Sequence, residues 1–181
     1  KDITSNPDNK AEKKMEEAIE NLRSQGESAG GIVKCIATNV PAGLGEPVFD
    51  KLDAQLAKAM LSIGAIKGIE FGKGFDVADM FGSTNNDTAK ACENSVDFVT
   101  NNAGGILGGI SNGNTIEFSV AVKPVPSIFK VQNAISKTEN GYTNTELQIK
   151  GRHDVCLCPR IVPVVEAMTN IVLADMILLN R

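Results

Sequence analysis

The feature that most constrains this chain is an apolar stretch near its C-terminal end, residues 159–179. Apolar side chains occupy most positions, so a helix formed here is apolar on nearly all of its faces. A membrane span of this length is disfavoured, because Glu166 and Asp175 would place two carboxylates in lipid at high cost. The sequence therefore predicts a helix covered by other elements on both sides, and no membrane partner.

The rest of the chain mixes helical and strand patterns. Apolar residues at helical spacing predict helices over residues 11–22 and 47–62, while residues 1–9 are polar and expected to be flexible. Asn112-Gly113 is typical of a two-residue hairpin turn. The chain is therefore assigned to the α+β class. Strands are expected at residues 30–40, 66–71 and 116–122, and on both sides of Asn140-Gly141.

Composition narrows the partners of the chain. The formal net charge is −4 and no long run of Lys or Arg occurs, so nucleic acid is not an expected partner. An anionic ligand would have to be held by a few placed cations and backbone amides. Four scattered cysteines and the lack of a secretory signal favour reduced thiols in the cytoplasm. The chain opens without Met and is expected to be a piece of a longer protein.

A glycine-rich run, NAGGILGGIS at residues 102–111, has two interpretations. Glycine allows the backbone to approach a flat or phosphorylated ligand and to present amides to it. The same glycines can instead allow a strand to pack closely against a neighbouring element. The spacing is not G-x-G-x-x-G, and no βαβ unit with a following acidic residue is evident, which argues against a dinucleotide-dependent oxidoreductase.

The second candidate site is GRHD at residues 151–154. Arg152 and Asp154 are two residues apart and would point the same way on an extended backbone. The guanidinium could bind a phosphate or carboxylate, and Asp154 could move a proton. The alternative is a salt bridge between these two side chains beside an exposed His153. A metal site using His153 and two nearby cysteines is disfavoured, because the spacing is loose and structural zinc usually takes four ligands.

Taken in order, several segments resemble the chorismate synthase family, and the resemblance covers nearly the whole chain after residue 25. They are GESAGG at 26–31, GLGEPVFDKLDA at 43–54, SIGAIKGIE at 62–70, GF at 74–75, NAGGILGGIS at 102–111, KP at 123–124, GRHD at 151–154 and PR at 159–160. The resemblance implies a β-α-β sandwich of antiparallel sheets enclosing helices, with this chain forming about half of that fold, and assembly as a homotetramer.

The resemblance also implies a reaction, the anti-1,4-elimination of phosphate from 5-enolpyruvylshikimate 3-phosphate to give chorismate in the shikimate pathway. Reduced FMN is the implied cofactor of this lyase, with NADPH as a candidate reductant. Asp154 matches the family's carboxylate that assists proton removal beside the flavin. The implied flavin contacts are Gly64, Ala65, Gly108, Lys123, Pro124, Val125, Pro126, Ser127 and Arg152.

The sequence departs from the family pattern in two ways. Gly64 stands where the family usually has Asn or Pro, Val125-Pro126 replaces Thr-Ser, and Val155 replaces Pro. Family members are also much longer, and their reactive histidines, most substrate-binding arginines and an Arg- and Ser-rich FMN segment lie outside the matching part. We therefore expect the isolated chain to be inactive. The alternative is a non-catalytic module for folding or oligomerisation that keeps part of a flavin or phosphate site.

Overall fold

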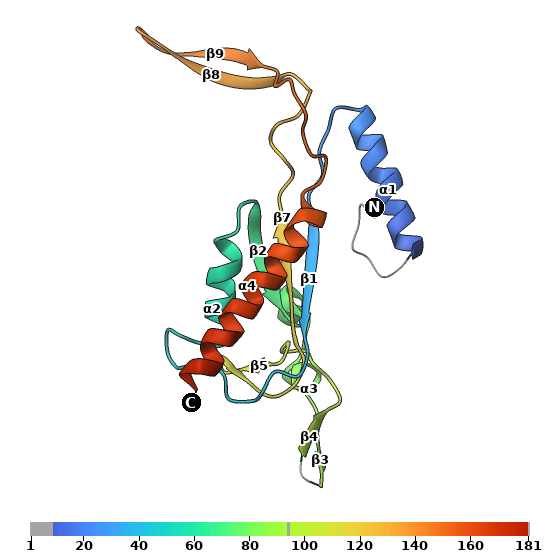
Figure 1. Cartoon of the computed structure of the whole chain (residues 1–181), viewed down its shortest axis with the longest axis vertical. Helices are drawn as coiled ribbons and strands as arrows, with labels where there is room; N and C mark the ends of the chain where they lie inside the picture. The colour runs from blue at the N-terminus through green and yellow to red at the C-terminus, as the bar shows by residue number, and fades with distance from the viewer. Residues whose placement is uncertain (1–8, 94, 181) are drawn as a thin grey trace. The chain divides into compact units, whose positions relative to one another are not determined.

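A computed structural model describes residues 9–93 and 95–180. Of residues 1–9, which were expected to be flexible, residues 1–8 lie outside the described part of the chain and Asn9 begins a helix. The described residues form two compact units. The first contains residues 9–31 and 123–160, and the second contains residues 32–122 and 161–180. Figure 1 labels most of the helices and strands of both units along the chain.

The first unit begins with helix α1, Asn9–Ser24, which confirms the helix predicted over residues 11–22. The backbone of Gly26 has φ of 69°, a left-handed conformation that glycine adopts without steric cost. The amides of Gly26 and Glu27 donate hydrogen bonds back to carbonyl oxygens of the last helical turn. Glycine therefore ends the helix and satisfies carbonyl groups that would otherwise lack partners.

The first unit also contains a two-stranded hairpin of β8, Gln132–Thr138, and β9, Gly141–Leu147. This hairpin confirms the strand pair expected around Asn140-Gly141. Its large apolar side chains face solvent: Ile135 is 70% exposed and Tyr142 is 74% exposed. Because an isolated hairpin is marginally stable in water, this one contributes little to a hydrophobic core.

The second unit is built on a three-stranded sheet with the order β1-β7-β2 (Figure 1). The central strand, β7, pairs antiparallel with β2. Every second side chain of β7 from Ile116 to Val122 is buried, as its alternating sequence predicts for a sheet with one covered face. The strands are β1 Gly31–Ala37, β2 Ile66–Phe71 and β7 Ile116–Val122, close to the predicted segments.

Helix α2, Leu52–Leu61, buries Leu52, Leu56 and Met60 in the core of the second unit. The prediction that this helix begins at residue 47 is wrong. Residues 46–51 form a loop instead, in which the amide of Glu46 donates to the carbonyl oxygen of Asp50 at 2.9 Å.

Helix α4, Cys158–Leu179, confirms the predicted C-terminal helix. Its buried residues recur every three or four positions and so form one face. On this face the Oγ1 atom of Thr169 lies 3.6 Å from the Sγ atom of Cys35 in β1.

The prediction that α4 is covered on both sides is wrong for the described chain. Only 28% of the most apolar stretch of α4 is buried. The side chains of Ile171, Leu178 and Leu179 are more than half exposed. The reason is that, among the described residues, a single three-stranded sheet is available to cover the helix. By length and composition alone, α4 also meets the requirements of a membrane span, as the core helices of soluble proteins can.

Short elements complete the second unit. A hairpin turn was expected at Asn112-Gly113, but the two-residue turn is Gly108-Gly109, between β5 and β6. The strand after Asn112 pairs with β1 and β2 rather than with β6, so Asn112-Gly113 only redirects the chain. These elements are the 3-10 helix η1 Gly74–Asp79, the helix α3 Gly82–Asn85, and the strands β3 Ala89–Cys92, β4 Ser95–Phe98, β5 Ile106–Leu107 and β6 Ile110–Ser111.

Candidate functional site

The GESAGG segment holds the first unit together. The amide of Ala29 donates to the carbonyl oxygen of Val155 at 2.8 Å, which attaches the loop after GRHD to this segment. The hydroxyl of Ser28 donates to the carbonyl oxygen of Val125 at 2.7 Å. Two segments predicted to carry site residues are therefore anchored to the same short stretch of backbone.

Glu27, in the same stretch, forms an ion pair with Lys130, with 2.8 Å between Oε1 and Nζ. The hydrogen bond from Lys130 is the main cause that holds the pKa of Glu27 below its ordinary value. The carboxylate is thus charged at neutral pH and its charge is offset by the paired lysine.

These segments surround a cavity of about 1150 Å³ within the first unit. Three of the predicted site residues line it, namely Ser127, Arg152 and Asp154. A volume of this size accommodates a nucleotide-sized ligand. The lining residues are Ile19, Arg23, Gly26, Glu27, Ser127, Ile128, Phe129, Arg152, His153, Asp154, Val155, Cys156, Pro159 and Arg160.

The salt bridge of Asp154 is made with a different arginine from the one considered in the sequence. The Nη2 atom of Arg160 lies 3.0 Å from Oδ1 of Asp154. Among the described residues, no ion pair or hydrogen bond engages Oδ2 of Asp154 or the side chain of Arg152. The structure therefore shows no salt bridge between Arg152 and Asp154 among its described residues. The guanidinium of Arg152 is then available to bind an anion.

His153 is half-buried, so the expectation that it is exposed is wrong. Its ring packs edge-on against Phe129, with 5.4 Å between ring centroids. The Nε2 atom of His153 is buried and has no hydrogen-bond partner within the described part of the chain. A buried polar atom without a partner in a cavity wall is a position where a ligand could complete the bonding.

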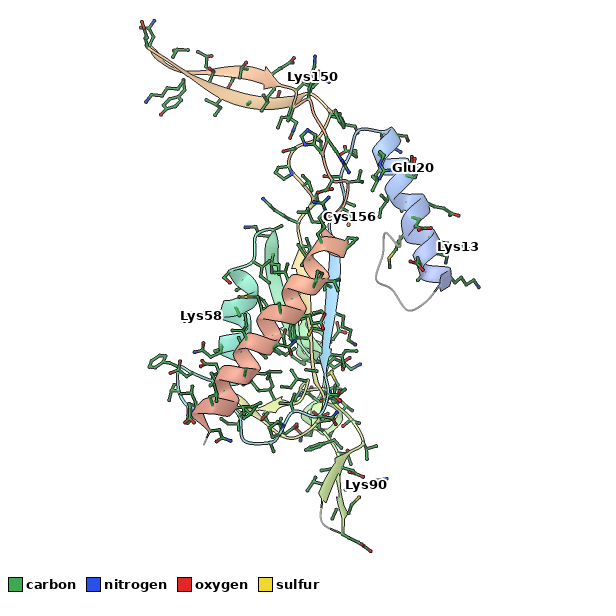
Figure 2. The ribbon with its side chains drawn as sticks, in the orientation of Figure 1. Lys13, Glu20, Lys58, Lys90, Lys150 and Cys156 are labelled. Carbon is green, nitrogen blue, oxygen red and sulfur yellow. The ribbon has the colours of Figure 1, made fainter. Side chains whose placement is uncertain are left out.

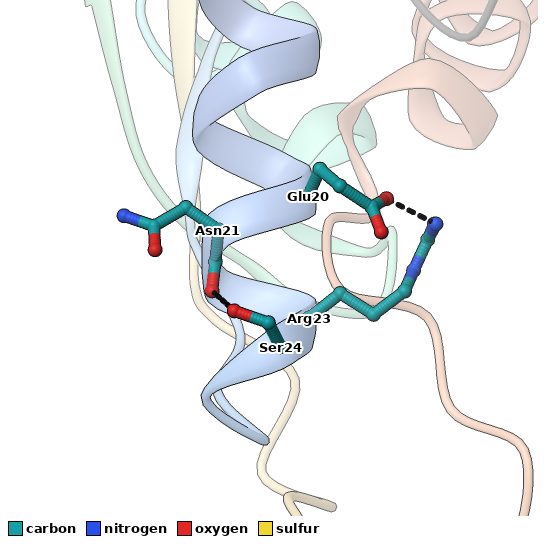
Figure 3. A network of polar contacts seen from close by, with 4 residues as sticks. All are labelled: Glu20, Asn21, Arg23 and Ser24. Atoms are coloured by element: carbon teal, nitrogen blue, oxygen red, sulfur yellow. Dashed lines mark hydrogen bonds and ion pairs between the residues drawn. The ribbon is translucent and has the colours of Figure 1, made fainter.

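Arg23 contributes a third guanidinium to the cavity wall, from the last turns of α1. Its Nη1 atom lies 2.6 Å from Oε2 of Glu20, one helical turn earlier. Figure 3 shows this pair beside the hydrogen bond from the Ser24 hydroxyl to the carbonyl oxygen of Asn21. Arg23 and Arg160 thus have carboxylate partners, whereas Arg152 has none among the described residues.

Cys156, labelled in Figure 2, and Cys158 are free thiols close to the start of α4. Burial, reinforced by neighbouring Cys156, raises the pKa of Cys158 to about 12, so this thiol stays protonated at neutral pH. No group of three or more His, Cys, Asp or Glu side chains that could hold a metal occurs among the residues of the described ranges.

The segment 123–127, predicted to contact flavin, leads from β7 to the hairpin of the first unit. Lys123 and Pro124 are exposed, as is Pro126, and none of the three lines the cavity. Only Ser127 reaches it, while Val125 contributes its carbonyl oxygen to the bond with Ser28.

The other predicted flavin contacts, Gly64, Ala65 and Gly108, belong to the second unit. A Cβ atom added at Gly64 or Gly108 would meet nothing within 4 Å, so both backbones are open to an approaching ligand. Ala65 has φ of 74°, a left-handed conformation that side-chain-bearing residues seldom adopt and that is commonest at functional sites.

The remaining glycines of the 102–111 run serve close packing. A Cβ atom at Gly104 would lie 2.5 Å from the carbonyl oxygen of Glu117, and one at Gly105 would lie 2.4 Å from that of Thr115. Gly108 and Gly109, with φ of 60° and 84°, instead form the two-residue turn that joins the strands of a hairpin. The packing interpretation therefore holds for Gly104 and Gly105, whereas Gly108 keeps an open surface.

Asp87 fixes the start of this glycine run. Its Oδ1 and Oδ2 atoms accept hydrogen bonds from the amides of Asn102 at 2.6 Å and Ala103 at 3.0 Å. Burial alone would raise the pKa of Asp87, but these hydrogen bonds outweigh it and hold the pKa below its ordinary value. Nothing in the local sequence indicated this contact, since Asp87 lies in a polar stretch distant from the glycines.

Other site residues were also missed from sequence. Arg160 belongs to the PR segment, but its pairing with Asp154 depends on the turn that α4 makes after Cys156. Arg23 lies on a helix whose many charges indicated only a solvent-facing surface. Ser28 lies in the GESAGG segment, and its bond to Val125 spans nearly a hundred residues of sequence.

Comparisons with known proteins identify relatives of this chain. The sequence model described as chorismate synthase matches residues 1–178. Chorismate synthase of Archaeoglobus fulgidus is 52% identical over 174 residues, covering 96% of this chain and 48% of that protein. The enzyme of Methanosarcina mazei is 55% identical over 168 residues, covering 93% of this chain and 46% of that protein.

A solved structure supports the same conclusion. A crystal structure of chorismate synthase has a TM-score of 0.76 and 34% identity, covering 94% of this chain and 44% of that chain. The chain thus spans about half the length of the relatives that it matches. Because both the sequence and the fold of this chain match over nearly its whole length, the chain belongs to the chorismate synthase family.

Proposed function

We propose that the protein carrying this chain eliminates phosphate from 5-enolpyruvylshikimate 3-phosphate to give chorismate, with reduced FMN as cofactor. The observation that carries the proposal is the cavity of the first unit. There an unpaired guanidinium, Arg152, stands two residues from a carboxylate, Asp154, with one oxygen free of described partners. Membership of the chorismate synthase family makes this reaction the expected one.

The residues of the cavity fit an anionic flavin or a phosphorylated substrate. Three arginines in its wall supply positive charge, and Arg152 is free to bind an anion through two parallel N–H donors. The partnerless Nε2 atom of His153 offers a further polar contact. In the second unit, the open backbones at Gly64 and Gly108 allow the close approach that a flat ring requires.

Each residue has a separate task in this proposal. Reduced FMN, when bound, supplies the electron-rich ring system on which the family's elimination depends. Asp154 takes up a proton at Oδ2, the oxygen that Arg160 leaves free. Arg152 holds an anionic group in the cavity and so orients the reactants. Lys123 to Ser127 provide contacts to the cofactor.

The implied assembly is a homotetramer in the cytoplasm, with NADPH as a candidate source of electrons for the flavin. The exposed apolar side chains of α4, such as Ile171 and Leu178, agree with burial by further polypeptide. Sedimentation of the full-length protein measures its mass directly. A monomer at micromolar concentration would contradict the tetramer without affecting the proposed reaction.

The reaction is tested by incubating the full-length protein that carries this chain with 5-enolpyruvylshikimate 3-phosphate and chemically reduced FMN. We expect equal amounts of phosphate and chorismate to appear. A folded, flavin-loaded protein that releases neither product would contradict the proposal and favour the non-catalytic module.

The isolated 181-residue chain provides a second test. We expect it to be inactive and to bind FMN weakly, because it spans about half the length of its relatives. Loss of half of the contacts should weaken affinity by a factor of about 100 or more, since each 1.4 kcal/mol changes affinity about tenfold. Flavin fluorescence titration measures this, with the full-length protein as control. Equal affinities would show that this chain alone contains the flavin site.

A further inference from the structure

We propose that Arg160 is a positioning residue for Asp154: it holds one carboxylate oxygen so that the other faces the reactants. The inference rests on the proposed function, in which Asp154 moves a proton. It adds a residue to which neither the sequence pattern nor the resemblance assigned a role.

The geometry of the pair supports this role. A single contact of 3.0 Å joins Nη2 of Arg160 to Oδ1 of Asp154. Within the described ranges, Oδ2 of Asp154 accepts no hydrogen bond, so the carboxylate is held at one end and free at the other. Both side chains line the same cavity, and Asp154 is the less exposed of the two, at 35% against 68%.

The backbone around Arg160 makes this contact a property of the fold. Arg160 lies in the first turn of α4, where its amide donates to the carbonyl oxygen of Leu157 at 3.0 Å. Pro159 precedes it and restricts the backbone at the start of the helix. The GRHD loop is fixed in turn by the bond from Ala29 to Val155. Two anchored segments therefore present the arginine and the carboxylate to each other.

Stability alone is a weak explanation of this pair. Salt bridges between partly exposed side chains typically contribute about 0–1 kcal/mol, because water screens them and ordering both side chains costs entropy. The other charged or titratable side chains that line this cavity include Arg152, His153, Arg23 and Glu27, and Glu27 is paired with Lys130. Of these, none forms an ion pair with the carboxylate of Asp154 in the described structure, so Arg160 is the charged group in position to orient it.

The test compares Arg160→Ala and Arg160→Lys in the full-length protein loaded with reduced FMN. We expect Arg160→Ala to lower the single-turnover rate by roughly ten- to a hundredfold, since a displacement of about 1 Å can have that effect. FMN affinity, KM and the thermal midpoint should change little, because Arg160 acts through Asp154. Arg160→Lys should recover part of the rate, and added guanidinium ion should recover part of it in Arg160→Ala.

A double-mutant cycle with Asp154→Asn separates this inference from the proposed function. If Asp154→Asn is itself fully active, the proposed role of Asp154 fails. If Asp154→Asn keeps a slow but measurable rate and Arg160→Ala does not lower that rate further, Arg160 acts through Asp154, as proposed. A normal rate in Arg160→Ala, or a loss that adds to that of Asp154→Asn and appears in FMN affinity, would overturn the inference.

Discussion

The two compact units of this chain differ in what surrounds their side chains. In the second unit, Ile116 and Val120 of the central strand are fully buried. In the first unit, Ile135 and Tyr142 of the hairpin face solvent, and three arginines and two carboxylates are among the residues that line its cavity. The second unit therefore supplies most of the apolar burial that stabilises the chain, whereas the first places charged groups around a cavity.

The two conspicuous motifs of the sequence divide in the same way. The glycine run of the second unit serves packing at Gly104 and Gly105 and keeps an open backbone at Gly108. The GRHD loop of the first unit contributes Arg152 and Asp154 to a cavity. A motif whose glycines pack closely and a motif that lines a cavity look equally conspicuous in the sequence, and their surroundings distinguish them.

The largest expected difference comes from one substitution made in both units. Ile116→Ala should lower the free energy of unfolding by about 2–5 kcal/mol, because it removes buried methyl groups and leaves a cavity. Ile135→Ala, at a side chain that is 70% exposed, should change it by less than about 0.5 kcal/mol. Urea unfolding of the chain measures both. Equal losses would show that the hairpin is covered in solution and that the contrast between the units is false.

A smaller effect is expected at Asp87. Asp87→Asn keeps one acceptor but turns an N–H group toward a backbone amide, so it should cost about 1–2 kcal/mol at neutral pH. Because hydrogen bonding lowers the folded-state pKa of Asp87, its contribution is present above the unfolded value near 3.8 and is lost as pH falls through the folded value.

The difference in unfolding free energy between Asp87→Asn and the parent chain should therefore shrink as pH is lowered below about 4. Unfolding curves at a series of pH values measure this, with Asp79→Asn, at an exposed position, as the matched control. A difference that stays constant with pH would show that the carboxylate charge does not fix the glycine run.

The smallest effect is expected at the turn between α2 and β2. Ala65→Gly should raise the free energy of unfolding by about 0.5 kcal/mol, because the left-handed backbone costs alanine about 1 kcal/mol and added glycine entropy offsets part of this gain. Ala57→Gly, inside helix α2, should instead lower it by about 1 kcal/mol. If both substitutions lowered the thermal midpoint by the same amount, Ala65 would not be held in the left-handed conformation in solution.

Periodic patterns were sufficient to predict most elements of the fold. The alternation from Ile116 to Val122 predicted a half-buried strand, and the apolar stretch at 159–179 predicted α4. Two predictions failed, the first because strand pairing overrode local preference and the second because the described residues supply one three-stranded sheet to cover the helix. Asn112-Gly113 resembles a hairpin turn, but the following strand pairs elsewhere, and α4 is covered on only one face by the described residues.

For the candidate site, sequence patterns selected residues that line the cavity, but they did not predict the contacts of these residues. Arg152 and Asp154 were identified as a cation and a proton acceptor, and both line the cavity. The alternative of a salt bridge between them was wrong for the described residues, because Arg160 of α4 forms the ion pair with Asp154, and no local pattern encodes where that helix turn lies. Contacts between distant segments, such as Ser28 with Val125, depend on the fold and cannot be obtained from spacing.

The central claim is that Asp154 moves a proton while Arg152 binds an anion, and paired variants of the full-length protein test it most directly. The measurement is the single-turnover rate of Asp154→Asn and Arg152→Ala, with FMN affinity and thermal midpoint determined on the same samples. Asp154→Asn should lose about 100- to 10,000-fold in rate with FMN affinity nearly unchanged, whereas Arg152→Ala should weaken binding as well as turnover. Normal turnover by Asp154→Asn, after correction for its folded fraction, would contradict the account and leave the Asp154–Arg160 pair with a structural role only.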